Sequence, residues 1–267
     1  MYTHPVCVGV WGDGEEKIIL IFKNMPIRKL QFFPGNLYHL FSRGNAKRDI
    51  FNNDKDRYRF LQGLYISNNN NCNFGLTHLE GRKTGFTLLE IKEIFERDKI
   101  RYDPFVKIYI DCLMPNHYHL LVEEVKEGGI VRFMQRSGNS YGRYFTIKND
   151  RPGSLFQGRF KAVRVETDDQ LKYLVAYINV INPAQLIEPE LKEKGVHNFD
   201  KVFKFIDKYN WGTHQEFMGR RESILIDKNK ILSEMFPNHK TYLEFVKDIL
   251  RSKEKKMWAT IDGLTFE

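Results

Sequence analysis

Two neighbouring segments of alternating side chains constrain the fold of this chain more than any other feature. Val106 to Leu113 alternates as a β-strand does, and His117 to Glu123 is a second segment with the character of a strand. Only Met114, Pro115 and Asn116 separate the two segments. A connection this short joins antiparallel neighbours. The sequence therefore predicts an antiparallel hairpin in the middle of the chain.

Further strands and helices surround this hairpin. Thr87 followed by Glu90, and Thr167 followed by Gln170, have the capping-box pattern that begins a helix. The second of these helices must end before Pro183, because the residue before a proline avoids helical angles. Strands separated by helices indicate an α+β fold, an antiparallel sheet with helices mainly on one face. Strands are predicted at residues 36–43 and 161–165, and helices at residues 55–66, 87–97 and 129–147.

The two ends of the chain differ from its middle. Met25 begins a segment that reads as a fresh start, so we expect residues 1–24 to be an N-terminal extension and Met25 to be the natural initiator. Residues 25–190 are expected to form the main domain, and residues 191–267 a helical C-terminal region. Charged helical segments are predicted in that region at residues 199–209, 222–236 and 240–253.

Positive charge is concentrated in one segment. The formal net charge is +8, and eight cations accompany a single acid, Asp150, between residues 132 and 164. Aromatic residues are interleaved with them, a mixture typical of proteins that bind single-stranded nucleic acid. A solvated basic face with its aromatic rings turned into the core explains the same composition. The cations are Arg132, Arg136, Arg143, Lys148, Arg151, Arg159, Lys161 and Arg164.

Composition argues against several other classes of protein. No apolar run approaches the roughly 18 residues that a membrane span needs. Cys7, Cys72 and Cys112 form no Cys-x-x-Cys pair, which argues against a zinc knuckle and a disulfide framework. We therefore expect a cytoplasmic protein with no membrane partner.

His117 and His119 are two residues apart on the second strand of the predicted hairpin. Alternation sends both imidazoles to one face, where two such rings can chelate a divalent metal. A lone His-x-His pair is more often packed or exposed than bound to metal. Tyr173 and Tyr177 lie four residues apart and therefore on one side of the predicted helix that begins at Thr167.

Four motifs extend this pattern along the chain, and the resemblance that they carry covers about residues 25–189. They are residues 38–45 with Ile50 and Phe51, residues 114–123, residues 153–161, and residues 177–183. Together they resemble the first strand, the metal-binding strand, the basic loop and strand, and the nucleophile helix of the HUH single-tyrosine transposases. The resemblance is strongest to the transposases associated with repetitive extragenic palindromes. It makes residues 25–190 the expected catalytic domain.

The resemblance implies a ferredoxin-like, palm-type antiparallel sheet and a specific chemistry. His117 and His119 are implied to ligate Mg²⁺ or Mn²⁺, and Tyr177 to attack a phosphodiester of single-stranded DNA with a hairpin or palindromic sequence. A tyrosine has a pKa of roughly 10, so its attack needs a cation that stabilises charge on the phosphate. The implied activity is that of an endonuclease and strand transferase with a 5′-phosphotyrosine intermediate. The protein is expected to act as a monomer or homodimer, with the basic segment holding the DNA.

The spacing after Tyr177 departs from the family pattern. The family commonly has Tyr-x-x-x-Asn-Pro, whose amide completes the metal site, whereas Asn182 lies five residues after Tyr177. On an ideal α-helix the fifth residue is offset by about 140° and faces away. A π-bulge that absorbs the extra residue, or unwinding before Pro183, returns Asn182 to the site. Asn182 is therefore the expected third ligand, and Asn179 the fallback.

Other assignments fit the same residues. Tyr173 is the alternative nucleophile, and His39 is expected to be structural or a DNA contact rather than a ligand. The chain could also be a domesticated, catalytically silent protein that binds DNA hairpins. A third reading is an RNA-binding or RNA-processing factor that uses the same surface.

Overall fold

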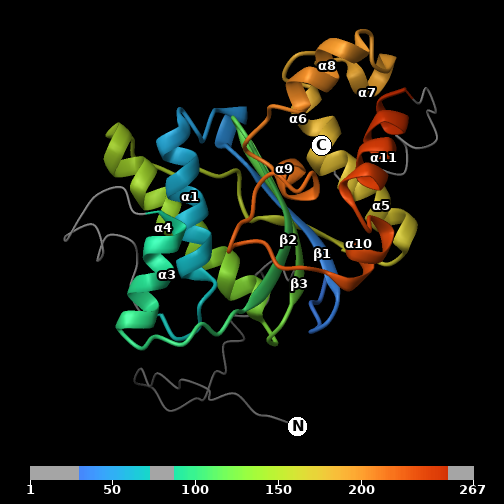
Figure 1. Ribbon diagram of the computed structural model, residues 1–267. Helices are drawn as coiled ribbons and strands as arrows, with labels where there is room; N and C mark the ends of the chain where they lie inside the picture. The colour runs from blue at the N-terminus through green and yellow to red at the C-terminus, as the bar shows by residue number, and fades with distance from the viewer. Residues whose placement is uncertain (1–29, 73–86, 252–267) are drawn as a thin grey trace, which may run out of the picture. The chain divides into compact units, whose positions relative to one another are not determined.

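The computed structural model describes residues 30–72 and 87–251 (Figure 1). The chain divides into two compact units, residues 1–31 and residues 32–267, and every element named below belongs to the second unit. The expected extension at residues 1–24 lies outside the described residues, as does the end of the last predicted helix. The division at residue 190 stays a prediction. Within the described part of the chain, no helix combines the length and the apolar character that a bilayer crossing requires.

A four-stranded antiparallel sheet forms the centre of the second unit. Its strands are β1 (Leu37–Arg43), β2 (Val106–Met114), β3 (His117–Glu124) and β4 (Lys161–Val165), in the order β2-β3-β1-β4. β2 and β3 form the predicted hairpin, with Met114 opposite His117 and a register shift between Ile108 and Ile110. The expected α+β fold with an antiparallel sheet is confirmed.

Three helices cover one face of this sheet: α1 (Asp54–Ser67), α3 (Leu88–Arg97) and α4 (Gly129–Asn149) (Figure 1). α1 and α4 pack against each other, and the ring of Phe60 on α1 lies 4.6 Å from Tyr118 of β3 and 5.1 Å from Tyr141 of α4. The alternate residues of β3 that point this way, Tyr118, Leu120 and Val122, are all buried. An aromatic cluster therefore joins these two helices to the sheet.

The other face is also covered by helices, which the sequence analysis did not expect. α5 (Asp168–Ala176), the π-helix η3 (Tyr177–Ile181) and α6 (Asn182–Ala184) pack there in one buried cluster with Ile110, Cys112 and Leu121 of the sheet. Helices are needed on both faces because β2 and β3 bury their side chains on both sides. The prediction of helices mainly on one face holds for α1, α3 and α4 only.

The C-terminal helices belong to the same buried cluster as the sheet. They are α7 (Leu191–Lys194), α8 (Phe199–Ile206), α9 (His214–Phe217), α10 (Lys230–Met235) and α11 (His239–Arg251). Tyr242 of α11 is fully buried in this cluster with Ile181 of η3. The predicted helix at residues 222–236 is shorter than expected, since only α10 is helical within it.

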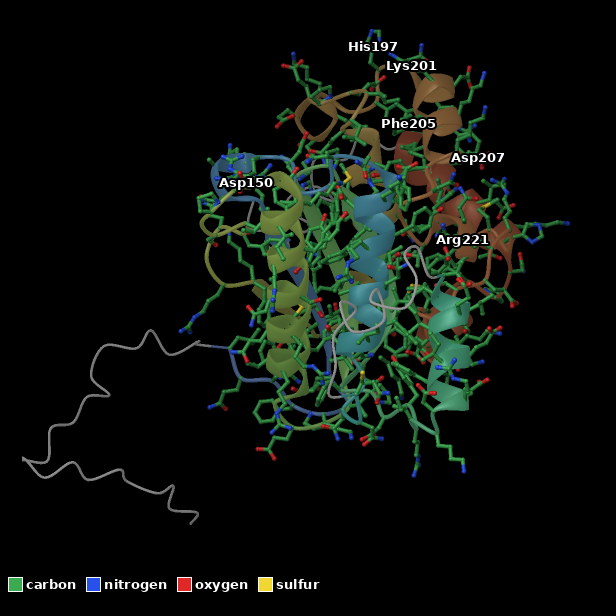
Figure 2. All side chains as sticks on the ribbon, turned by 90° about the vertical axis from the view of Figure 1, so that its left-hand side faces the viewer. Asp150, His197, Lys201, Phe205, Asp207 and Arg221 are labelled. Atoms are coloured by element: carbon green, nitrogen blue, oxygen red, sulfur yellow. The ribbon has the colours of Figure 1, made fainter. Side chains whose placement is uncertain are left out.

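His214 lies inside this C-terminal packing. Its Nδ1 is 2.9 Å from the Tyr242 hydroxyl, its Nε2 is 3.9 Å from a carboxylate oxygen of Asp207, and the residue is 1% exposed. Figure 2 shows Asp207 beside the C-terminal helices. Burial lowers the pKa of His214 to about 4, although the Asp207 carboxylate favours the protonated form. The folded protein therefore holds this imidazole neutral over most of the acidic range.

We expect the free energy of unfolding to fall as the pH drops from about 6.5 to about 4, with His214 contributing up to roughly 3 kcal/mol. In this window the unfolded chain binds a proton at His214 and the folded chain does not, so acid favours unfolding. Urea denaturation at several pH values measures the slope. The His214→Gln variant should show a shallower slope, whereas replacing the exposed His197 by glutamine should leave the slope as in the wild type.

Candidate active site

Tyr177 lies where the helix that begins at Thr167 changes its winding. The capping box forms as predicted, with the Thr167 hydroxyl accepting a hydrogen bond from the Gln170 amide at 3.2 Å. At Tyr177 the winding becomes that of a π-helix, and the backbone N–H of Asn182 donates to the Tyr177 carbonyl, five residues back. Pro183 has no amide hydrogen to continue an α-helical ladder at this point. The π-bulge is thus the one of the two predicted adjustments that the structure adopts.

The π-bulge changes the relation between Tyr177 and Asn182. In a π-helix the residue five positions on lies one turn further along, where an α-helix would place the fourth residue. Both residues are fully buried. The fallback residue Asn179 is engaged elsewhere, since its Oδ1 accepts a hydrogen bond from the Thr213 hydroxyl at 2.9 Å.

The structure brings Tyr177 together with the histidines of the sheet. Its ring centre lies 5.4 Å from that of His119 and 6.3 Å from that of His39, in edge-to-face arrangements. The rings of His117 and His119 are 4.9 Å apart and perpendicular to each other. Tyr173, one turn earlier, is partly buried and packs against the hydrophobic cluster. Of the two tyrosines weighed from the sequence, Tyr177 is the one in contact with the histidines.

The Nδ1 atoms of His117 and His119 both have side-chain partners. The Nδ1 of His117 donates to the Asn116 side-chain oxygen at 2.6 Å, and the Nδ1 of His119 lies 2.8 Å from the Nε2 of His39. The His117 bond assigns its proton to Nδ1, which leaves the Nε2 lone pair for a ligand. A proton donated from His119 to His39 leaves the same lone pair on His119. Neighbours of this kind orient metal-binding imidazoles in proteins.

Burial also keeps His119 in its neutral form. The ring is 0% exposed, and burial lowers its pKa well below the usual value, with the positive environment of His117, His39, Lys192 and Arg43 adding to the effect. A neutral imidazole is the form that binds a metal ion.

The residues present fit a divalent cation. The Nε2 atoms of His117 and His119 are both buried. The side-chain amide of Asn182 is buried too, and its Nδ2 has no hydrogen-bond partner among the described residues. The Asn182 oxygen accepts a 3.4 Å hydrogen bond from Gln185. Two imidazoles with an amide oxygen are a donor set that suits Mn²⁺ or Mg²⁺. Within the described part of the chain, no group of three His, Cys, Asp or Glu residues is placed to hold a metal ion.

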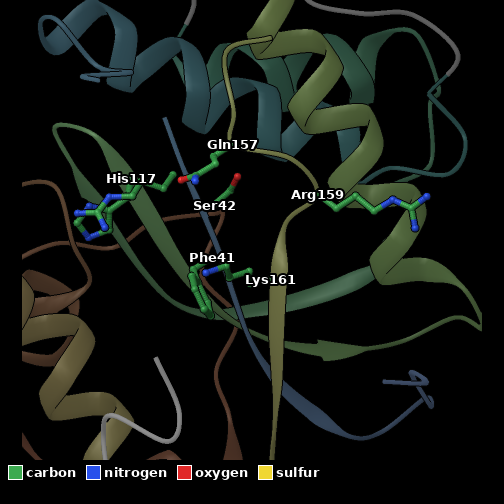
Figure 3. A pocket seen from close by; sticks show the side chains of 7 residues that line it. Phe41, Ser42, His117, Gln157, Arg159 and Lys161 are labelled. Atoms are coloured by element: carbon green, nitrogen blue, oxygen red, sulfur yellow. The ribbon is translucent and has the colours of Figure 1, made fainter. Parts of the chain in front are cut away.

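A small pocket opens beside His117 (Figure 3). Its volume is about 100 Å³, and the backbone amide of Gln157 fastens one wall to β1 by a 2.8 Å hydrogen bond to the Arg43 carbonyl. Lys161 lies 5.7 Å from the centre of the Phe41 ring, whereas Arg159 extends away from His117. The lining is rich in cations and consists of Phe41, Ser42, Arg43, His117, Gln157, Arg159 and Lys161.

Residues 80–180 match the family model described as "Transposase IS200 like". This segment includes β2, β3, both neighbouring histidines and Tyr177. Over these residues the chain is similar to the IS200-like transposase family. This match agrees with the resemblance to the single-tyrosine transposases.

Comparisons with whole proteins add little to this assignment. A REP-associated tyrosine transposase bound to a REP hairpin is 13% identical, with a TM-score of 0.42, and the match covers 78% of this chain and 93% of that one. The tRNA(His) guanylyltransferase from Saccharomyces cerevisiae is 10% identical, with a TM-score of 0.30, and the match covers 67% and 74%. These scores are too low to bear on function. No match was found among curated proteins.

The eight cations predicted to bind DNA have different surroundings. Arg136 donates to the backbone carbonyls of Asn69 and Cys72, and Lys148 forms an ion pair with the buried carboxylate of Asp56. Lys148 therefore links α4 to α1, and Arg136 links α4 to the residues that follow α1. Arg159 and Lys161 line the pocket, and the remaining four cations, Arg132, Arg143, Arg151 and Arg164, are exposed. DNA contact by these residues stays a prediction.

The sequence analysis missed two residues of the site. It gave Asn116 no role, although Asn116 accepts a hydrogen bond from His117, whereas the contact of His39 with His119 agrees with the structural role considered for His39. It also missed Lys192, whose Nζ lies 3.4 Å from the Tyr177 hydroxyl. Alternation in β1 could have placed His39 on the same face as Phe41, but no pattern marks Lys192, because it lies in a four-residue helix.

We expect Lys148→Met to lower the free energy of unfolding by about 1–3 kcal/mol, because it removes a partner of the buried Asp56 carboxylate. Lys161→Met should change it by less than about 0.5 kcal/mol, since Lys161 is exposed. Urea denaturation of both variants measures the difference. Equal stability of the two would contradict an internal role for Lys148.

Proposed function

We propose that this chain is a metal-dependent single-stranded DNA endonuclease and strand transferase that acts at hairpin-forming sequences. The main support for this proposal is the position of the buried Tyr177 ring, whose centre lies 5.4 Å from that of His119. His117, on the same strand as His119, lies next to the His119 ring. A phenol next to two imidazoles is suited to attack on a phosphodiester near a bound cation. The match of residues 80–180 to the IS200-like transposase family model supports this chemistry.

His117, His119 and Asn182 are the residues that would hold the ion. When bound, Mg²⁺ or Mn²⁺ stabilises negative charge on the phosphate oxygens and orients the ester for in-line displacement. Asn116 and His39 contact the Nδ1 atoms of the two imidazoles and so orient the rings. The π-bulge supports Asn182 as third ligand, since it returns this residue to one turn from Tyr177.

Tyr177 supplies the nucleophile. Its Oη forms a bond to phosphorus while the bond from phosphorus to the 3′-oxygen breaks, the phenol proton is lost, and the 3′-oxygen takes up a proton. The product is a 5′-phosphotyrosine and a free 3′-hydroxyl. Because the covalent ester keeps the energy of the broken bond, the strand can be joined to a new end without ATP.

The pocket beside His117 offers a path for the DNA strand. Arg43, Arg159 and Lys161 supply positive charge that suits a phosphate backbone. The hairpin substrate follows from the resemblance to palindrome-associated transposases.

A silent hairpin-binding protein is the second candidate. Tyr177 is wholly buried and the Asn182 oxygen accepts a hydrogen bond from Gln185, an arrangement that also suits a site without turnover. Formation of a covalent adduct with DNA distinguishes the nuclease from the silent binding protein.

We expect Tyr177→Phe to abolish the covalent adduct and to leave hairpin affinity within about twofold, because only the nucleophilic oxygen is lost. A fluorescent hairpin oligonucleotide is incubated with protein and Mn²⁺ and resolved on a denaturing gel. Tyr173→Phe is the matched control and should form the adduct as the wild type does. An adduct in the Tyr177→Phe variant would show that another residue is the nucleophile. Binding by the wild type without adduct would favour the silent protein, and preference for an RNA hairpin would favour an RNA-binding role.

We expect Asn116→Ala to weaken Mn²⁺ binding by about 10–100-fold, because the His117 ring loses the acceptor that orients it. Asn116→Asp keeps an acceptor at this position and should bind Mn²⁺ at least as well as the wild type. Isothermal titration with Mn²⁺ measures both variants independently of catalysis. Unchanged affinity in the alanine variant would argue against a metal at His117.

A further inference from the structure

Lys192 places an ammonium group beside the reacting oxygen of the proposed site. Its Nζ is 3.4 Å from the Tyr177 hydroxyl and 4.8 Å from the centre of the Tyr177 ring. A separation of 3.4 Å is longer than a strong hydrogen bond, so the main effect of the contact is electrostatic. Because Tyr177 is fully buried, water screens this positive charge less than it would at the surface.

The fold holds Lys192 in place through its neighbours. Leu191, the preceding residue, is 1% exposed and belongs to the buried cluster that includes Tyr177. The carboxylate of Glu188 accepts hydrogen bonds from the amides of His197 and Asn198, which closes the segment around α7. Lys192 therefore projects from a fixed piece of backbone toward Tyr177.

We propose that Lys192 is a further catalytic residue, whose ammonium group stabilises the negative charge that develops between the Tyr177 oxygen and the phosphate during attack. This inference rests on the proposed function. As the bond from Oη to phosphorus forms and the bond to the 3′-oxygen breaks, the phenol proton passes to water and the 3′-oxygen takes a proton from water. Lys192 keeps its own protons. It acts on the reverse step in the same way, when the Tyr177 oxygen becomes the leaving group.

The neighbouring lysine of the same helix provides a matched control. Lys194 is two residues away, its side chain is 70% exposed, and it forms an ion pair with Glu190. A general effect of removing positive charge from α7 should appear in both variants. An effect of the contact with Tyr177 should appear only at Lys192.

The test measures the rate of adduct formation on a fluorescent DNA hairpin with Mn²⁺, for the full chain. We expect Lys192→Met to slow the adduct about 100-fold, which is the usual scale for loss of one group that stabilises a transition state. Lys192→Arg should recover most of the rate because it restores the charge, and Lys194→Met should react at the wild-type rate. Lys192→Gln provides a second neutral variant if the methionine variant has a lowered melting temperature.

Hairpin affinity separates catalysis from binding. In a Tyr177→Phe background, Lys192→Met should leave the dissociation constant within about threefold. A wild type that forms no adduct overturns the proposed function and this inference with it. A wild type that forms the adduct, with neutral Lys192 variants reacting at the same rate, overturns the role of Lys192 alone. A loss of hairpin affinity as large as the loss of rate also overturns it, because Lys192 would then act in binding.

Discussion

The candidate site depends on a sheet that is buried on both faces. Alternation in β3 sends Tyr118 toward the aromatic cluster of α1 and α4, and it sends His119 toward η3 on the other side. If the second face were solvated, His119 would be exposed and its pKa would stay near the ordinary value. Covering that face removes water from the imidazole and brings Tyr177 against it. Packing and proposed chemistry therefore have the same origin.

The π-bulge at residues 177–181 is the second element on which the site depends. π-helical turns are rare and are often found at functional sites, because they insert one residue and redirect those that follow. In this chain the insertion is followed at once by Pro183, which could not have continued the α-helical hydrogen bonds. The surrounding side chains from Ala176 to Ala184 are all buried, so tertiary packing holds a winding that local propensity would not favour.

Local patterns in the sequence were enough to predict the hairpin, both capping boxes and the shared face of His117 and His119. These features depend on residues close together in the chain, where alternation and capping have direct physical causes. The contact between His39 and His119 depends on the register of two strands 80 residues apart, which no local pattern gives. The hydrogen bonds of Arg136 also depend on distant parts of the chain. Composition placed Arg136 in a basic segment, and no local pattern indicates that its guanidinium bonds to backbone carbonyls beyond the end of α1. The helices on the second face of the sheet were not predicted, because several of them belong to residues 191–267, whose charged sequence suggested a separate helical region.

The position of Lys192 shows how the C-terminal region takes part in the site. A helix of four residues has almost no stability of its own in water. α7 is held because Leu191 belongs to the buried cluster that also contains residues of η3, α8 and α11, so this packing determines where the adjacent lysine lies. A change that loosened this packing would move the ammonium group away from Tyr177 without altering any residue of the sheet. The C-terminal helices thus contribute to the electrostatics of Tyr177, although they supply neither the histidines nor the nucleophile.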